Sequence, residues 1–441
     1  MGKFDFYLIT DIHYFERSLG CSGEAYENYM KSQQKEMGRN QPTNRVLFDK
    51  LAEDKDVETI LIAGDLTQNG EYESHKSLIE DLRKLKASGK RILLITALHD
   101  HSDHPFAFDG NERLKIKGTT NEELYEMYRE FGYDEAIAFD ENSYSYVAKL
   151  TDGVRLLAIN VDGIPHECEG CIDERLKQWL SDQIDEANAA GDKIIAMEHY
   201  PLIPQQPIFD LIGDAHLKDW QNRAAFLADK GVHLILTGHM HAQSIKKFTS
   251  ENGNSIIDIQ TSSTIGYPVN YRKMTIEGDK IAVKVLDVPA YTAEDGTLVD
   301  KDYFRALFSE MIPNKLGSML KDGKPDQTFV QKTALKLARK LTVGGLMRMV
   351  GLSASKELRD MKITDFAVML VLPMFEGDPK FTPGTPVYND LSKLLKRISP
   401  VLGKLNKKLS KNGKTVDLKE LIMSSLYNAD GQSDNECVIE F

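Results

Sequence analysis

The feature that most constrains the fold is a series of short apolar runs, each followed at once by a small motif rich in His and Asp. The early runs are rich in Ile, Leu and Val without alternation, which is typical of strands covered on both faces. Segments far apart in the sequence would therefore bring their polar ends to one edge of a sheet. The motifs are Asp11-Ile12-His13, Gly64-Asp65, His99-Asp100, His199 and Gly238-His239-Met240-His241.

Strand-like and helix-like stretches alternate over about the first 290 residues, which predicts an α/β fold. The later runs SIIDIQ and IAVKVL alternate partly, as outer or antiparallel strands do. We therefore expect a mixed sheet, arranged as two packed sheets flanked by helices. The expected strands are 4–10, 58–63, 91–96, 144–150, 154–160, 193–198, 232–237, 255–260 and 281–287. The expected helices include 43–54, 73–88, 121–131, 173–190 and 216–230.

The length of 441 residues is too great for one ordinary core and indicates two or three domains. Residues 288–302 contain Pro289 and the turn sequence AEDGT, so we place a boundary there. Residues 1–290 should form the α/β domain, and residues 303–441 a mainly helical accessory region. We interpret its basic amphipathic segments as a helical cap with a solvated Lys face. Contact with a membrane or a protein partner is the alternative.

Composition narrows the classes of partner. The formal net charge of −12 argues against broad binding of a nucleic acid polymer, because no overall basic surface is available. No apolar run reaches the length of a transmembrane helix. The start MGKFDFYLIT leads straight into Asp11 as a core strand, so we expect no secretory signal and a cytoplasmic location, unless a leader has been removed. The oligomeric state does not follow from the sequence.

The four cysteines are too few for a disulfide framework in a chain of this length. Cys168 and Cys171 form the only local pair, and no second pair completes a zinc site. We interpret them as free loop thiols. A redox pair is the alternative, although the motif does not start a helix after the first strand.

The spacing of the motifs favours a metal site. In Asp11-Ile12-His13 the carboxylate and the imidazole fall on the same face, because strand side chains repeat every two residues. His239 and His241 repeat this geometry, and Gly238 before them permits a tight backbone. Asp65 could bridge two cations about 3.5–4 Å apart. A mixed Asp/His set suits Mn, Fe or Zn better than Ca or Mg.

The order of the five motifs resembles that of the calcineurin-like metallophosphoesterases, over about residues 1–290. The resemblance implies a four-layer α-β-β-α sandwich with a di-metal centre at the strand ends. It also implies that His99 protonates the leaving oxygen or stabilises charge there, and that Asp100 orients His99. The implied ligands are Asp11, His13 and His241 for one metal, His199 and His239 for the second, and Asp65 as the bridge.

One position departs from the pattern of the family. The third motif usually carries an Asn that binds the second metal, and here Leu98 stands in its place. We therefore expect weaker binding of the second metal, or a replacement ligand. The nearby His101 and His104 are candidates, although a surface cluster is our preferred interpretation of them.

These observations predict metal-dependent hydrolysis of a phosphoester, with a metal-activated hydroxide as nucleophile. The expected substrate is a small-molecule or nucleotide phosphodiester or phosphomonoester, and a nuclease is the weaker enzyme alternative. Residues 14–42 form a long connection at the site and could contact substrate, or could be a surface helix that does not. A non-catalytic metal-binding scaffold with a helical partner-binding tail is the second class of hypothesis, motivated by Leu98.

Overall fold

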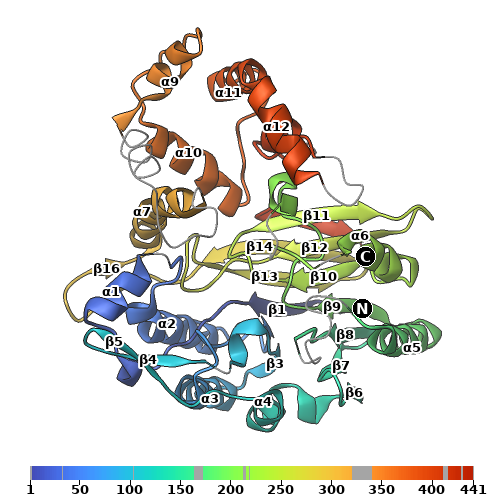
Figure 1. Ribbon diagram of the computed structural model, residues 1–441. Coiled ribbons are helices and arrows are strands. Elements are labelled where there is room, and N and C mark those ends of the chain that lie inside the picture. Colours follow the sequence, from blue (N-terminus) through green and yellow to red (C-terminus); the bar gives the residue numbers. More distant parts are fainter. Residues whose placement is uncertain are drawn as a thin grey trace. The chain divides into compact units, whose positions relative to one another are not determined.

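The computed structural model describes residues 2–440 except 32, 103, 163–171, 212–214, 218, 320–339, 411–415, 429 and 430. The predicted α/β class with a helical C-terminal region is confirmed (Figure 1). The chain forms two compact units. The first unit holds residues 1–205, 213–306 and 434–441, and the second holds residues 206–212 and 307–433.

Two sheets pack in the centre of the first unit. The first sheet has the strand order β17-β14-β13-β1-β2-β3. Strands β1, β2 and β3 run parallel, whereas β13, β14 and β17 continue the sheet antiparallel. Their bounds are β1 Phe4–Ile9, β2 Thr59–Ala63, β3 Arg91–Ile95, β13 Asn270–Glu277, β14 Lys280–Asp287 and β17 Glu436–Glu440.

The second sheet has the strand order β11-β12-β10-β9-β8-β7-β6. Its four central strands, β12, β10, β9 and β8, are mutually parallel. The bounds are β6 Ala138–Asp140, β7 Ser145–Thr151, β8 Val154–Ala158, β9 Lys193–Met197, β10 Leu234–Thr237, β11 Ser244–Thr249 and β12 Ser255–Gln260.

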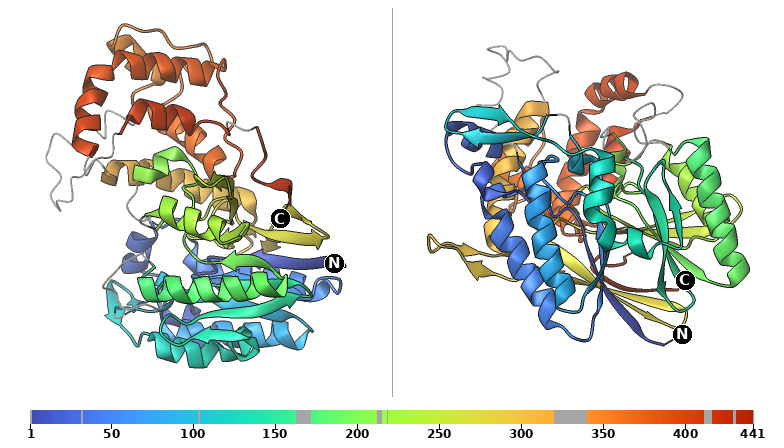
Figure 2. Two further views of the ribbon diagram at one scale, coloured as in Figure 1. Left: turned by 90° about the vertical axis from the view of Figure 1, so that its right-hand side faces the viewer. Right: turned by 90° about the horizontal axis from the view of Figure 1, so that it is seen from below.

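Helices cover the outer faces of both sheets, which completes the expected four-layer α-β-β-α sandwich (Figure 2). Helices α2 (Asn40–Glu53) and α3 (Tyr72–Ala87) lie along the first sheet, and α5 (Glu174–Ala190) and α6 (Trp220–Asp229) along the second. Helix α5 begins where the Asp173 carboxylate caps the Leu176 N–H and ends at Gly191 in the left-handed conformation. Its face of Leu176, Leu180 and Ile184 packs with the outward side chains of the second sheet.

Smaller elements lie around the sandwich. The helices α1 (Glu24–Met30) and α4 (Asn121–Tyr128) follow β1 and β5 along the chain, and short 3-10 turns connect several strands. Two hairpins are formed by β4 Phe106–Asp109 with β5 Glu112–Lys115 and by β15 Tyr291–Thr292 with β16 Leu298–Val299. The 3-10 turns are Arg17–Leu19, Met37–Arg39, Leu98–Asp100, Arg129–Phe131, Tyr133–Glu135 and Pro207–Leu211.

The second unit is helical and has its own apolar core, which includes Met347, Leu391 and Leu395. Its helices are α7 Lys301–Met319 (of which 307–319 belong to this unit), α9 Val343–Met349, α10 Ile363–Phe375, α11 Pro386–Arg397, α12 Ser399–Leu409 and α13 Leu418–Ser424. Most of the expected helical segment FVQKTALKLARKL lies outside the described residues. Among the described residues, no helix is long and apolar enough to span a membrane.

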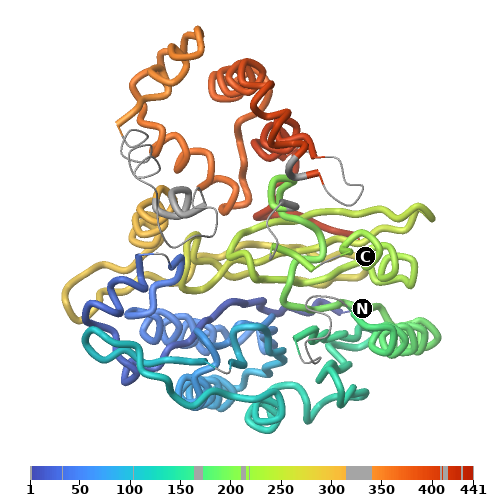
Figure 3. The backbone as a smooth tube through the Cα atoms, in the orientation of Figure 1, coloured from blue at the N-terminus to red at the C-terminus, as the bar shows by residue number. Residues whose placement is uncertain are grey.

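The chain returns to the first unit at its end. Strand β17 pairs with β14 in register Ile439 to Ile281, so the first sheet contains both ends of the described chain (Figure 3). The fully buried Arg272 on β13 donates from Nη2 to the carbonyl of Asp434, 2.9 Å away. This bond fixes the segment that leads into β17, and it also gives a buried guanidinium one of the partners it needs.

Candidate metal centre

The proposed ligands lie where parallel strands of the two sheets end. Asp11 and His13 follow β1, and Asp65 follows β2 in the same sheet. His199 follows β9, and the pair His239 and His241 follows β10 in the other sheet. Because β1 and β2 are parallel, as are β9 and β10, each sheet presents these side chains at one edge.

The structure brings all six side chains into two groups with the geometry of a metal site. Within each group, the ligand atoms lie within 4.8 Å of one another. All six residues are buried except His239, which is partly buried. The first triad is Asp11, His13 and His241, and the second triad is Asp65, His199 and His239.

In the first triad a carboxylate oxygen faces two imidazoles. Asp11 Oδ1 lies 3.2 Å from His241 Nε2 and 3.6 Å from His13 Nε2. The other oxygen, Oδ2, accepts hydrogen bonds from the Thr10 hydroxyl at 2.8 Å and the His239 backbone N–H at 2.9 Å. These two donors turn Oδ1 toward the histidines, which is the orientation that a metal ligand needs.

In the second triad the Asp65 carboxylate reaches both groups. Its Oδ2 lies 3.1 Å from His199 Nε2 and 3.5 Å from His13 Nε2, while Oδ1 accepts the His99 backbone N–H at 3.0 Å. His199 Nδ1 lies 2.8 Å from the Ala63 carbonyl, so a proton on Nδ1 leaves the Nε2 lone pair facing Asp65. The Asp65 carboxylate therefore lies close to one imidazole of each triad.

The buried polar atoms of the centre fit two cations. Asp11 Oδ1 and His199 Nε2 are buried and have no hydrogen-bond partner besides the imidazole and carboxylate atoms that face them within the two triads. Burial opposes charge on both carboxylates, yet the imidazoles hold the pKa of Asp11 and Asp65 well below its usual range. Burial likewise opposes protonation of His199, but the two carboxylates raise its pKa to about 10. The carboxylates thus attract positive charge, and metal ions bound by neutral imidazoles would satisfy them.

The backbone at the centre is strained. Asp11, His13, Asp65, His239 and His241 all have positive φ, between 42° and 73°. Non-glycine residues rarely adopt this conformation, and such residues cluster at functional sites. Gly238 has no room for a side chain, because an added Cβ would overlap the Thr10 hydroxyl and lie 2.5 Å from Asp11 Oδ2.

Three polar side chains that the sequence analysis did not identify hold this strained backbone. The Ser263 hydroxyl donates to the Asp11 carbonyl at 2.7 Å. Asn40 donates to the carbonyls of Ile12 and His13, and Asn44 donates to that of Ile12 at 3.2 Å. Since they bind main-chain atoms, no side-chain pattern in the sequence reveals them.

His99 and Asp100 lie on the 3-10 turn after β3. The ring centroids of His99 and His13 are 5.0 Å apart, which places His99 beside the first triad. The Asp100 carboxylate accepts the backbone N–H groups of Ala97 and Thr67, both at 2.8 Å. Asp100 therefore holds the backbone of the turn that carries His99.

Residues 14–42 contribute a cation to the centre. Lys35 Nζ lies 3.1 Å from His13 Nδ1, and the residue is only 7% exposed. A backbone bridge to Gly266 holds Lys35 in place. Burial, together with the charge of Lys35, lowers the pKa of His99 to about 4.

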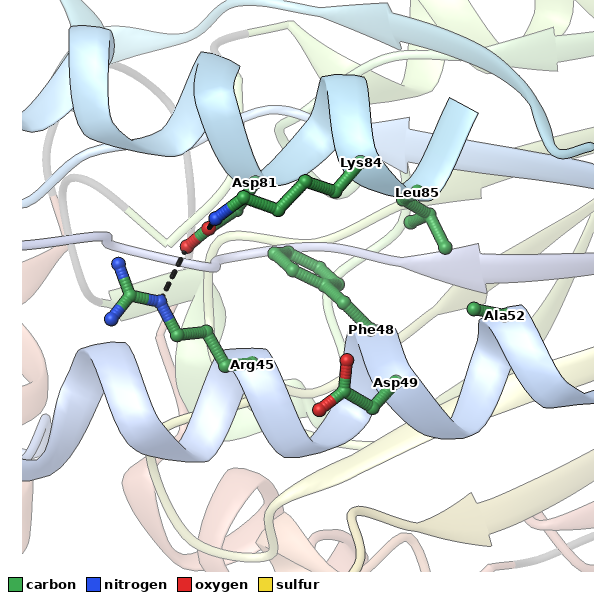
Figure 4. Close-up of a pocket in the computed structure, with 7 residues that line it drawn as sticks. All are labelled: Arg45, Phe48, Asp49, Ala52, Asp81, Lys84 and Leu85. Atoms are coloured by element: carbon green, nitrogen blue, oxygen red, sulfur yellow. Dashed lines mark hydrogen bonds and ion pairs between the residues drawn. The ribbon is translucent and has the colours of Figure 1, made fainter. Parts of the chain in front are cut away.

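A separate pocket between α2 and α3 supports Tyr14, the residue after His13. Asp81 in this pocket accepts a hydrogen bond from the Tyr14 hydroxyl at 2.5 Å. It also accepts one from Arg45 Nε at 2.7 Å (Figure 4). None of the six triad residues lines it. We therefore assign it a structural role.

The remaining candidates lie outside the triads. Leu98 is 43% exposed, and His101 and His104 belong to neither metal group among the described residues. Cys168 and Cys171 lie outside the described residues, whereas Cys21 and Cys437 are free thiols.

Comparison with known proteins points to one family. The family model of the calcineurin-like phosphoesterases matches residues 4–243. No curated protein matches the sequence.

Several solved structures are similar to this chain at low sequence identity. A dimetal phosphatase from Danio rerio has a TM-score of 0.46 and 14% identity, over 64% of this chain and 95% of that chain. A putative 5'-nucleotidase from Staphylococcus aureus has a TM-score of 0.41 and 14% identity, over 84% and 72%. A purple acid phosphatase from yellow lupin has a TM-score of 0.40 and 12% identity, over 68% and 53%.

Proposed function

Because this chain belongs to the calcineurin-like phosphoesterase family, we propose that it hydrolyses phosphoesters with two metal ions held by the two triads. The observation that carries the proposal is the position of Asp65 Oδ2, within 3.1 Å of His199 Nε2 and 3.5 Å of His13 Nε2. One carboxylate thus serves both triads, as a bridging ligand must. We assign the activity to residues 1–290 and treat residues 303–441 as an accessory region.

Each triad would hold one ion. Asp11, His13 and His241 would bind the first, His199 and His239 the second, and Asp65 both. The mixture of imidazole and carboxylate ligands favours Mn, Fe or Zn. When bound, such ions supply a low-pKa water as nucleophile and neutralise phosphate charge.

His99 is suited to act on the leaving oxygen. Burial and nearby positive charge lower its pKa to about 4, so the imidazole is neutral near pH 7. A neutral imidazole can donate one N–H to an oxygen that gains negative charge in the transition state. We propose that His99 stabilises this charge, and that Asp100 keeps the turn rigid through the backbone of Ala97 and Thr67.

Lys35 adds a buried positive charge beside the first triad. Phosphate oxygens are attracted to such a charge more strongly in a buried site than in water, because the effective dielectric constant is lower. We propose that Lys35 strengthens the binding of the anionic substrate. This assigns a contact role to residues 14–42.

The substrate class that we propose is a small-molecule or nucleotide phosphoester. The formal charge of −12 is unfavourable for binding a nucleic acid polymer along an extended surface. Leu98 favours a second candidate function, a non-catalytic metal-binding scaffold, because it cannot serve as the ligand found at that position in the family.

Turnover of chromogenic substrates tests the proposal. The protein is freed of metal with a chelator, titrated with manganese, and assayed with p-nitrophenyl phosphate and bis-p-nitrophenyl phosphate. We expect release of nitrophenol only after metal is added, and a loss of about a hundredfold or more in kcat for His99→Ala, as for removal of a group that stabilises transition-state charge. The exposed His104 provides the matched control, and His104→Ala should behave as wild type.

The two candidate functions give different results. If wild type binds two ions but is as inactive as His99→Ala on both substrates, the result contradicts the proposed hydrolase activity. It then supports the non-catalytic metal-binding scaffold.

A further inference from the structure

The second triad consists of Asp65, His199 and His239 among the described residues. His199 is buried, and its Nε2 faces Asp65 Oδ2 at 3.1 Å. In the family pattern an Asn adds a further ligand to this metal, but Leu98 stands at that position and its side chain has no atom that can bind a metal. The neighbourhood of Leu98 is therefore the place to look for a further ligand.

Asp162 lies at this place in the fold. Strand β8 ends at Ala158, and Asp162 follows four residues later. Because β8 runs parallel to β9 in register Ala158 to Met197, its carboxyl end lies at the same edge as His199. The apolar run VRLLA and the acid after it thus repeat the pattern of the other ligand motifs.

The surroundings of the Asp162 side chain connect it with the second triad. The charges of His199 and Asp65 act on its carboxylate, and so does the backbone N–H of Leu98. It also accepts the Tyr200 hydroxyl at 3.3 Å. The Tyr200 ring in turn lies 4.5 Å from the His239 ring, centroid to centroid.

The end of β8 is tied to the turn that carries Leu98. The Asn160 side-chain amide donates to the Thr96 hydroxyl at 2.9 Å, and its carbonyl oxygen accepts the Asp162 backbone N–H at 3.0 Å. One side chain therefore holds Asp162 and the segment before Leu98 together. Such support around a ligand is typical of metal sites.

We propose that Asp162 is the replacement ligand of the second metal, in place of the Asn that Leu98 displaces. This inference rests on the proposed dinuclear centre. The Asp162 carboxylate does not belong to the group of the second triad and accepts the Tyr200 hydroxyl instead, so binding the ion requires the side chain to move from this hydrogen bond.

Manganese binding to the full chain tests this without any activity readout. Isothermal titration calorimetry and metal analysis should give two ions for wild type, and a second ion bound about tenfold or more weakly for Asp162→Ala. Asp162→Asn should lose less, because an amide oxygen can still bind the ion. Asp152 is an exposed acid in the turn before β8, and Asp152→Ala serves as the control with unchanged binding.

A rescue variant keeps the test independent of folding. Leu98→Asn in the Asp162→Ala background restores the ligand type of the family and should restore binding of the second ion. The inference is overturned if Asp162→Ala binds the second ion as tightly as wild type does. It is also overturned if the double variant binds the second ion as weakly as Asp162→Ala does. Two ions bound by wild type without any hydrolysis contradict the proposed function and leave the assignment of Asp162 intact.

Discussion

The Nε2 atoms of His13 and His241 face one another at 2.9 Å, although 228 positions separate the residues in the sequence. If both nitrogens carried lone pairs, they would repel at this distance unless a proton or a metal ion lay between them. Asp11 Oδ1, 3.2 Å from His241 Nε2, supplies the negative charge that a cation at this point requires. We therefore expect this pair to bind the first metal of the proposed centre.

The first prediction concerns Asn40, which is fully buried and donates to the carbonyls of Ile12 and His13. Replacing Asn40 with Ala leaves these carbonyls without that donor. We expect the free energy of unfolding to fall by about 2 kcal/mol, since an unsatisfied buried group costs about 1–3 kcal/mol. Denaturant unfolding of the variant and of wild type measures the loss.

Asn28 is exposed and provides the control for Asn40. Asn28→Ala should unfold at the denaturant concentration of wild type. If Asn40→Ala were equally stable and bound manganese equally well, Asn40 would have no part in holding the strained Asp11–His13 segment.

The second prediction concerns Gly238. In Gly238→Ala the new methyl group would overlap the Thr10 hydroxyl and approach Asp11 Oδ2 to 2.5 Å. We expect a loss of about 1–3 kcal/mol in stability, as for overpacking elsewhere, together with weaker binding of one manganese ion. Gly403 lies within α12 with no atom within 4 Å of an added Cβ, so Gly403→Ala should lose neither stability nor metal.

The third prediction concerns Lys35. Lys35→Met removes a buried charge beside His13, and we expect the Ki for inhibition by inorganic phosphate to rise about tenfold, which corresponds to about 1.4 kcal/mol. The stoichiometry of bound manganese should stay unchanged. Lys31, exposed in the same segment, is the control, and Lys31→Met should keep the wild-type Ki. An unchanged Ki in Lys35→Met would remove Lys35 from the proposed substrate contacts.

The fourth prediction concerns the pH dependence of stability through His75. The His75 imidazole is fully buried between the Tyr128 hydroxyl at 2.8 Å and the Asp100 carbonyl at 2.8 Å, and burial lowers its pKa from 6.5 to about 4. Between these two values the unfolded chain binds more protons than the folded protein at this group. The contribution of His75 is therefore complete above pH 6.5 and decreases as the pH falls toward 4.

Unfolding by guanidinium chloride at about pH 7 and about pH 5 measures this effect. Its upper limit between these pH values is about 2 kcal/mol, because only the interval below the unfolded pKa of 6.5 contributes, at about 1.4 kcal/mol per pH unit. His75→Gln should lose less stability than wild type between the two pH values. His233, which is exposed, is the control, and His233→Gln should keep the wild-type dependence. An identical pH dependence in all three proteins would contradict the assignment.

The apolar runs made much of the first unit predictable. The expected strands at 4–10, 58–63, 91–96 and 193–198 match β1, β2, β3 and β9 to within one residue at each end. These strands are buried on both faces, so their composition carries the signal. Strand β13 (NYRKMTIE) was not predicted, because the charged residues Arg272 and Lys273 interrupt the apolar pattern that is expected of a strand inside a sheet. Tertiary contacts of the Arg272 guanidinium allow it to be buried there.

The candidate site was predictable only in part. The six expected ligands lie in two triads. They were predictable because each follows a strand, so that the local sequence pattern locates it. Ser263 and Asn40 were not predictable, since they act on main-chain carbonyls that only the fold brings to them. Asp162 did follow an expected strand, at 154–160, but a single acid after a strand is too common to be read as a ligand.

Anomalous diffraction from crystals grown with manganese locates the bound ions. We expect two anomalous peaks about 3.5–4 Å apart, one within the first triad and one within the second, with Asp65 between them. A single peak, or peaks away from both triads, would contradict a dinuclear centre in this protein.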